Sequence, residues 1–110
     1  MSSSRKILII YSPGKGIHSL LKTLERFRTE KVYVLIHEDD SKVVYRELRR
    51  ISRNNLKILV LSGRDAEVKA LKILVDSEPD IVIDCDQYNK LVVFKNLLKH
   101  SRLRLEQCIA

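Results

Sequence analysis

Ile7-Leu8-Ile9-Ile10-Tyr11 is an apolar run, and Ser12-Pro13-Gly14-Lys15-Gly16 follows it directly. A helical pattern then begins at Ile17 and repeats apolar residues every three or four positions. This order predicts a buried strand, a tight glycine loop and a helix. Backbone N–H groups in such a loop and the positive end of the helix both favour an anion. We therefore predict that residues 12–16 contact an anionic ligand.

The loop is not one of the common phosphate-binding fingerprints. It lacks the spacing and the Lys-Ser/Thr ending of a Walker A loop, and it lacks the third glycine of G-x-G-x-x-G. Serine, proline and glycine are also frequent in ordinary strand–helix turns. The loop by itself leaves the anion site and the plain turn as alternatives.

Short apolar runs and helical patterns alternate along the rest of the chain. Strands are predicted at residues 6–11, 31–37, 57–61 and 80–84, and residues 103–108 fit an edge strand. Such continuous apolar strands are typical of parallel sheets that are buried on both faces. Repeated strand–helix units of this length predict one Rossmann-like, three-layer α/β/α domain over residues 1–110, with a mainly parallel sheet.

Helices are predicted at about 16–28, from position 40 or 41 onward, from position 66 onward, and at about 90–100. Asp65 is a candidate N-cap for the third helix. The apolar side of that helix is predicted to hold Val68, Leu71, Leu74 and Val75.

The 110 residues carry a net charge of +7, and the basic surplus lies mostly in the first half of the chain. A surplus of this size favours polyanionic partners such as nucleotides or nucleic acid. No apolar run is long enough for a signal peptide or a membrane span, so we expect a cytoplasmic protein without membrane contact. Cys85 and Cys108 lack metal-ligand spacing, and we interpret them as two buried thiols rather than a disulfide.

In open parallel sheets, ligands bind beyond the carboxyl ends of the strands, near the point where the strand order reverses. The loops to search are therefore 12–16, 37–40, 62–65 and 84–90. No metal or other cofactor is expected, because no cluster has ligand spacing. Ser12 and Lys90 are the candidate catalytic residues. The candidate ligand-binding residues are Pro13, Gly14, Lys15, Gly16, His37, Ser62, Gly63, Asp84, Asp86, Gln87 and Asn89.

The layout resembles the CRISPR-associated Rossmann-fold (CARF) sensors, including their ring nucleases. The resemblance rests on Ser12–Gly16 after the first strand, on the strand 32–37, and on Asp65-Ala66-Glu67 at a helix start. It rests also on Ile81-Val82-Ile83-Asp84 with a polar loop that ends in Lys90. That loop often reads Asp-x-Thr-x-Gly-x-Lys in the family; here the Thr and Gly positions hold Asp86 and Tyr88.

The resemblance implies a homodimer that binds a cyclic oligoadenylate across its two-fold axis. It also implies that such a protein can cleave the ring without a metal, with the ribose 2′-hydroxyl as nucleophile. Ser12 and Lys90 would then hold the ribose and the phosphate. Whether the ligand is cleaved or only bound stays open at this point.

A nonenzymatic nucleic-acid-binding or protein-interaction domain is the alternative function. Arg46, Arg49, Arg50 and Arg53 fall on one side of the second predicted helix and could contact phosphates. The same four residues also fit the solvated face of an amphipathic helix. Aromatic residues make up only 5% of the chain, which argues against a platform for stacked single-stranded bases.

Overall fold

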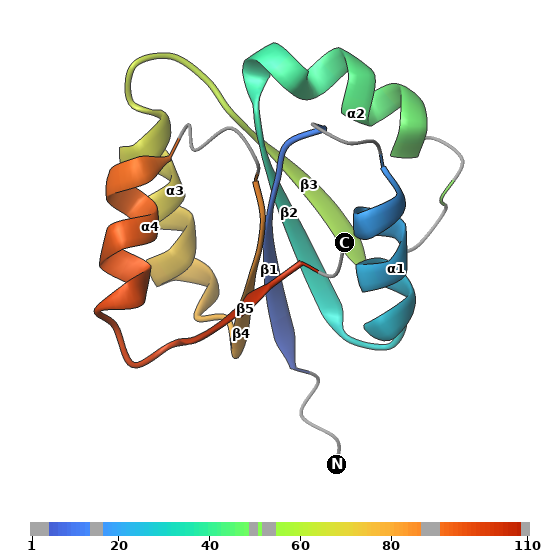
Figure 1. The fold of residues 1–110 in the computed structure, drawn as a ribbon. Helices are drawn as coiled ribbons and strands as arrows, with labels where there is room; N and C mark the ends of the chain where they lie inside the picture. Colours follow the sequence, from blue (N-terminus) through green and yellow to red (C-terminus); the bar gives the residue numbers. More distant parts are fainter. Residues whose placement is uncertain (1–4, 14–16, 49–50, 52–54, 87–90, 109–110) are drawn as a thin grey trace.

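The computed structural model describes residues 5–13, 17–48, 51, 55–86 and 91–108. Strands and helices alternate along it (Figure 1). The five strands are β1 (Lys6–Tyr11), β2 (Lys31–His37), β3 (Leu56–Leu61), β4 (Ile81–Cys85) and β5 (Arg104–Gln107). The helices are α1 (His18–Arg26), α2 (Ser41–Leu48), α3 (Ala66–Ser77) and α4 (Val92–Lys99), with a 3₁₀ turn, η1 (Glu38–Asp40), before α2.

The five strands form one parallel sheet in the order β3-β2-β1-β4-β5. The central strand β1 pairs with both β2 and β4, so that Ile7 lies between Val32 and Ile81. The chain builds outward from β1 to β3 and then returns to the other side of β1. The strand order therefore reverses between β1 and β4. The predicted parallel sheet and the predicted edge strand near the carboxyl terminus are both confirmed.

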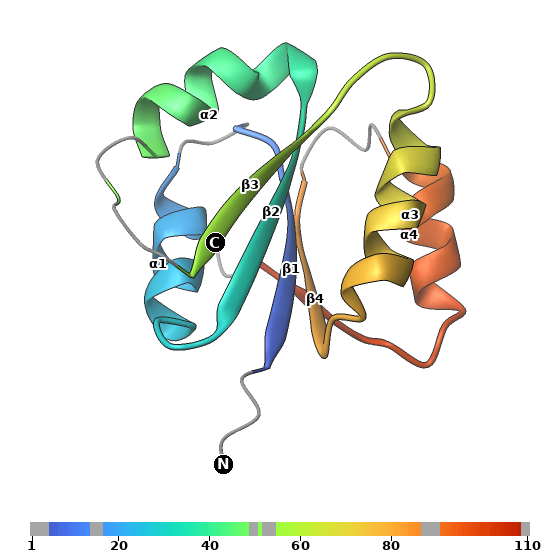
Figure 2. The same cartoon turned by 180° about the vertical axis from the view of Figure 1, so that it is seen from behind.

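Helices cover both faces of the sheet (Figures 1 and 2). Ile7, Ile9 and Tyr11 pack in the core that α1 and α2 cover, whereas Leu8 and Ile10 pack in the core of α3 and α4. Each of these five side chains is at most 4% exposed. A strand buried on both faces has no reason to alternate polar with apolar residues, which explains its unbroken apolar run. The three-layer α/β/α prediction is confirmed.

The predicted apolar side of α3 is only partly right. Val68 and Val75 are 69% and 67% exposed, while Ala66 and Ala70 are the buried residues of this helix. Apolar residues occur on both sides of α3, so its periodicity does not identify the inward face, and the small alanines let the helix approach the sheet. Asp65 precedes α3 but makes no side-chain capping bond, because its backbone lacks the extended conformation of an N-cap.

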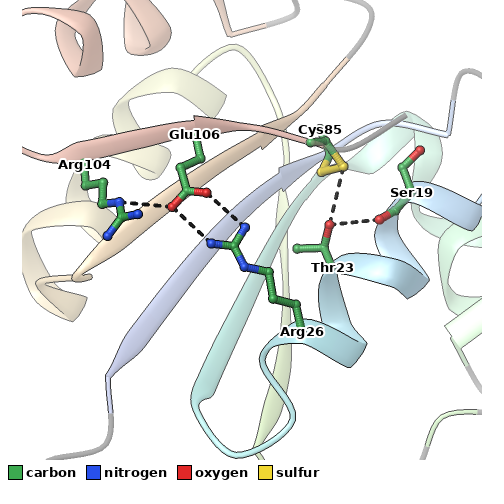
Figure 3. Close-up of polar contacts among 7 residues, drawn as sticks. Ser19, Thr23, Arg26, Cys85, Arg104 and Glu106 are labelled. Carbon is green, nitrogen blue, oxygen red and sulfur yellow. Dashed lines mark hydrogen bonds and ion pairs between the residues drawn. A yellow bond between two sulfur atoms is a disulfide. The ribbon is translucent and has the colours of Figure 1, made fainter.

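The interpretation of two separate thiols is wrong, because Cys85 and Cys108 form a disulfide. Cys85 ends β4 and Cys108 directly follows β5, and the ladder pairs Asp84 with Gln107 just before them. The two cysteines therefore occupy neighbouring positions on adjacent strands, with their Cα atoms 4.8 Å apart, within the range that a disulfide spans. Thr23 of α1 lies beside the bond, with Oγ1 3.6 Å from Cys108 Sγ (Figure 3).

An ion pair attaches the edge strand β5 to α1. Arg26 of α1 donates to Glu106 at 2.9 Å, and Arg104 lies 3.1 Å from the other oxygen of the same carboxylate (Figure 3). The hydrogen bond from Arg26 is the main cause that lowers the pKa of Glu106, despite an opposing effect of burial. The Arg26–Glu106 pair and the disulfide help to hold a strand of only four residues in place.

Within the described residues, no helix is both long enough and apolar enough to cross a bilayer.

Candidate functional site

A small crevice lies at the carboxyl ends of β1, β2 and β4, where the strand order reverses. Ser12 follows β1, is 3% exposed, and donates its backbone N–H to the carbonyl of Cys85 at 3.4 Å. The crevice holds about 10 Å³, room for about one water molecule. Its walls bring together three of the predicted site residues, Ser12, His37 and Asp86, with Tyr11, Asp40 and Leu91 beside them.

His37 ends β2, and the residues after it engage its ring. Its Nδ1 lies 3.2 Å from the backbone nitrogen of Asp39 and 3.3 Å from Oδ2 of the same residue. The Nε2–H tautomer accepts the N–H at Nδ1, whereas the neutral Nδ1–H tautomer and the imidazolium donate from Nδ1 to the carboxylate. Because both contacts use Nδ1, Nε2 is the ring nitrogen left for a ligand, and it can accept a proton only in the Nδ1–H tautomer.

A buried cation joins the two predicted aspartates of β4 and its loop. Lys95 of α4 places Nζ 3.1 Å from Asp84 Oδ1 and 3.0 Å from Asp86 Oδ2, and it donates to the backbone carbonyl of Asp86 at 3.2 Å. The side chains of Lys95, Asp84 and Asp86 are 9%, 15% and 4% exposed. Asp84 also accepts the backbone N–H of Asp86 at 3.0 Å. This network fixes the start of the loop that follows β4.

Sequence reasoning missed Lys95. The signal was present, because Leu91, Phe94 and Leu98 form the buried stripe of this segment and Lys95 falls inside that stripe. A lysine on the apolar side of a helix is rarely buried unless it is paired. Asp84 and Asp86, which were interpreted as ligand contacts, are its partners.

Tyr11 is a second crevice residue that was not predicted as part of the site. Burial raises its pKa to about 12, and the negative charges of Glu47 and Asp40 add to the effect. The phenol therefore stays protonated at neutral pH and can donate a hydrogen bond.

Ser62 and Gly63 do not line the crevice. The carbonyl and the hydroxyl of Ser62 accept hydrogen bonds from Lys69 Nζ at 3.0 and 3.2 Å. Gly63 has a φ of +77°, which explains the glycine, and its N–H donates to Glu38 at 3.1 Å. In this structure both residues tie the loop after β3 to its neighbours, a structural role that their turn-like composition does not distinguish from ligand contact.

Pro13 is half-buried directly after Ser12. Gly14, Lys15, Gly16, Gln87, Asn89 and Lys90 lie outside the described residues, and so do Arg49, Arg50 and Arg53 of the alternative hypothesis. The α4 helix begins at Val92, and its first turn receives a carboxylate, because Glu67 of α3 accepts the N–H of Phe94 at 2.9 Å. Glu67 thus supplies the negative group that a helix N-terminus favours.

The described part of the crevice is more acidic than the net charge of the chain suggests. The carboxylates of Asp40 and Asp86 line it, Asp39 is beside it, and Lys95 is already paired. Nowhere in the described ranges do three or more histidine, cysteine or acidic side chains gather in a way that could hold a metal ion.

Comparisons with protein-family models, with curated proteins and with solved structures gave no match.

Proposed function

We propose that the carboxyl edge of the sheet binds a cyclic oligoadenylate, with two copies of the chain sharing one ring, and that the site cleaves the ring slowly. The observation that carries the proposal is the meeting of Ser12 and His37 in one crevice at the point where the strand order reverses. That point is where open parallel sheets bind nucleotides. The CARF-like layout of the sequence adds the class of ligand.

Backbone N–H groups and lysine side chains would both contribute to recognition of the ring. Ser12 stands at the beginning of the glycine loop, whose N–H groups suit a phosphate. Lys15 and Lys90 supply the positive charge that the acidic crevice needs before it can accept a polyanion. A cyclic tetra-adenylate has a two-fold axis, and an isologous dimer presents the same surface twice around such an axis.

Cleavage would use the ribose of the ligand as the nucleophile. The 2′-hydroxyl attacks the adjacent phosphorus, the bond from phosphorus to the 5′-oxygen breaks, and a 2′,3′-cyclic phosphate and a 5′-hydroxyl result. In the neutral tautomer whose Nδ1–H donates to the Asp39 carboxylate, Nε2 of His37 would take the 2′-hydroxyl proton. The departing 5′-oxygen would take a proton from the resulting imidazolium or from water. Ser12 would orient the 2′-hydroxyl, and Lys90 would stabilise the charge on the phosphate.

Titration calorimetry with cyclic tetra-adenylate at low salt tests the binding. We expect saturable binding that weakens as salt is added, because charge attraction is screened. Lys90→Ala and Ser12→Ala should weaken it, whereas Lys99→Ala, which removes an exposed lysine at the end of α4, should not. The proposal would be rejected if cyclic tetra-adenylate gave no heat of binding and did not compete with any other ligand of the protein. Tighter binding of RNA or DNA in the same buffer would favour the nucleic-acid alternative.

A cleavage assay in excess EDTA tests the chemistry separately. Wild type should form linear products with 2′,3′-cyclic phosphate ends, and Ser12→Ala or His37→Ala should lower the rate about a hundredfold or more, the usual effect of losing one positioned group. Loss of all activity in EDTA would contradict a ribose-driven reaction. Tight binding without product over hours would leave a sensor or a ligand-sequestering protein.

A further inference from the structure

Three lysines lie side by side at the amino end of the sheet, far from the crevice. Lys6, Lys31 and Lys57 are at the starts of β1, β2 and β3. The ladder pairs Lys6 with Lys31 directly, and it pairs Lys57 with Tyr33, two residues beyond Lys31. Side chains alternate between the faces of a strand. All three lysines therefore lie on the face of the sheet that α3 and α4 cover, the same face as Leu8, Leu35 and Leu59 of their own strands.

The sheet is hollowed next to this row. A hollow of about 440 Å³ is lined by Lys31, Tyr33 and Lys57, together with Thr29 and Asn55. Tyr33 also lines a second hollow of about 220 Å³, together with Leu59, Ile73 and Asp76. The first hollow alone has the size of a small-molecule site. Its walls combine apolar surface and an aromatic ring with two cations.

Like charges in directly paired positions of a sheet are unfavourable. The acids at this edge do not relieve the repulsion. Glu30 pairs with Arg5 at 3.0 Å, and Glu106 pairs with Arg26 at 2.9 Å. Asp80 accepts the backbone N–H of Lys6 at 2.8 Å. No described carboxylate forms an ion pair with the ammonium group of Lys6, Lys31 or Lys57.

Polar groups beside the row are held in place. Asn55 donates both protons of Nδ2, to the carbonyls of Arg28 at 2.9 Å and Glu30 at 2.7 Å. Its amide is therefore oriented by the chain, and its oxygen is the atom left for a ligand. The hydroxyl of Thr29, which donates to Glu30 at 3.4 Å, can still accept a hydrogen bond.

We propose that this amino-edge hollow is a second ligand site, which takes a nucleoside phosphate. The phosphate would neutralise Lys6, Lys31 and Lys57, and the planar base would lie against Tyr33, whose ring is half-buried. Asn55 and Thr29 can accept hydrogen bonds from amino or hydroxyl groups of the ligand. The site is at the opposite end of the strands from Ser12, so it does not depend on the function proposed for the crevice.

Binding of adenosine 5′-diphosphate, adenosine and inorganic phosphate, followed by calorimetry and by backbone amide NMR shifts, tests the proposal. The diphosphate should bind saturably, more weakly at higher salt, with shifts centred on residues 29–33 and 55–57. Lys31→Gln combined with Lys57→Gln should weaken it about tenfold or more, which corresponds to about 1.4 kcal/mol. The matched control, Lys22→Gln combined with Lys72→Gln, removes the same charge from exposed positions of α1 and α3 and should change the affinity less than about twofold.

Four results would overturn the proposal. One is no binding of the diphosphate; another is equal affinity for both double variants. The third is shifts centred on the carboxyl ends of β1 and β4. The fourth is inorganic phosphate that competes as well as the diphosphate, which would reject a role for the base. Ser12→Ala should leave this binding unchanged while it weakens cyclic tetra-adenylate, so failure at either site is recognised separately.

Discussion

Replacing Lys95 with methionine should lower the free energy of unfolding by about 3–5 kcal/mol, the usual cost of breaking a buried ion pair from one side. The lysine contacts two carboxylates at 3.0 and 3.1 Å, and Asp86, the more buried of them, is only 4% exposed. Methionine keeps most of the apolar stem in place. The change therefore reports the lost charge more than lost packing.

The magnitude follows from the geometry. At about 3 Å and an effective dielectric constant of about 20, each attraction is worth roughly 5 kcal/mol before the cost of desolvation is subtracted. Taking three ions out of water offsets much of that gain in the wild type. In the variant both carboxylates stay buried without their cation, and they repel each other. Asp86 is 4% exposed, so it can regain water only through a local change of structure.

Urea denaturation followed by circular dichroism measures the effect. Lys99→Met, one turn further along α4 at an exposed position, is the matched control and should change stability by less than about 0.5 kcal/mol. Adding Asp86→Asn to Lys95→Met should recover part of the loss, because it removes one uncompensated charge. A loss below about 1 kcal/mol for Lys95→Met would refute the reasoning, since a surface ion pair would explain it equally well.

Two further predictions concern the disulfide and Tyr11. Reducing the Cys85–Cys108 bond should lower the free energy of unfolding by about 3 kcal/mol, because the bond closes a loop of 23 residues. Denaturation curves that do not change with reductant would contradict this prediction, and so would two free thiols titrated in the native protein. The pKa of Tyr11 is raised from 10.0 to about 12, so between these values the unfolded chain loses the proton before the native protein does, and stability should fall through that pH window. Tyr11→Phe should make the fall shallower, and parallel stability–pH curves for the two proteins would count against the burial of the phenol.

The site was predictable to the extent that it depends on where strands end. Ser12, His37 and Asp86 follow or end apolar runs, and parallel strands bring their carboxyl ends to one edge, so their meeting needed only the fold class. Ser62 also follows a strand, but that strand is β3, which lies at the edge of the sheet, away from the crevice. Excluding Ser62 from the crevice requires the strand order, which local sequence patterns do not predict.

Residue patterns alone determined the strand and helix periods, the parallel sheet and the three layers. A strand that is buried on both faces needs apolar residues at consecutive positions, and such runs are visible in the sequence. Tertiary structure decided which distant residues meet. The register of β5 against β4 brings Cys108 to Cys85, and the packing of α4 carries Lys95 to Asp84 and Asp86. Tertiary structure also turned Ala66 and Ala70 inward in place of Val68 and Val75. Such contacts join positions with large sequence separation, and their energies depend on distance and burial that exist only once the layers have packed.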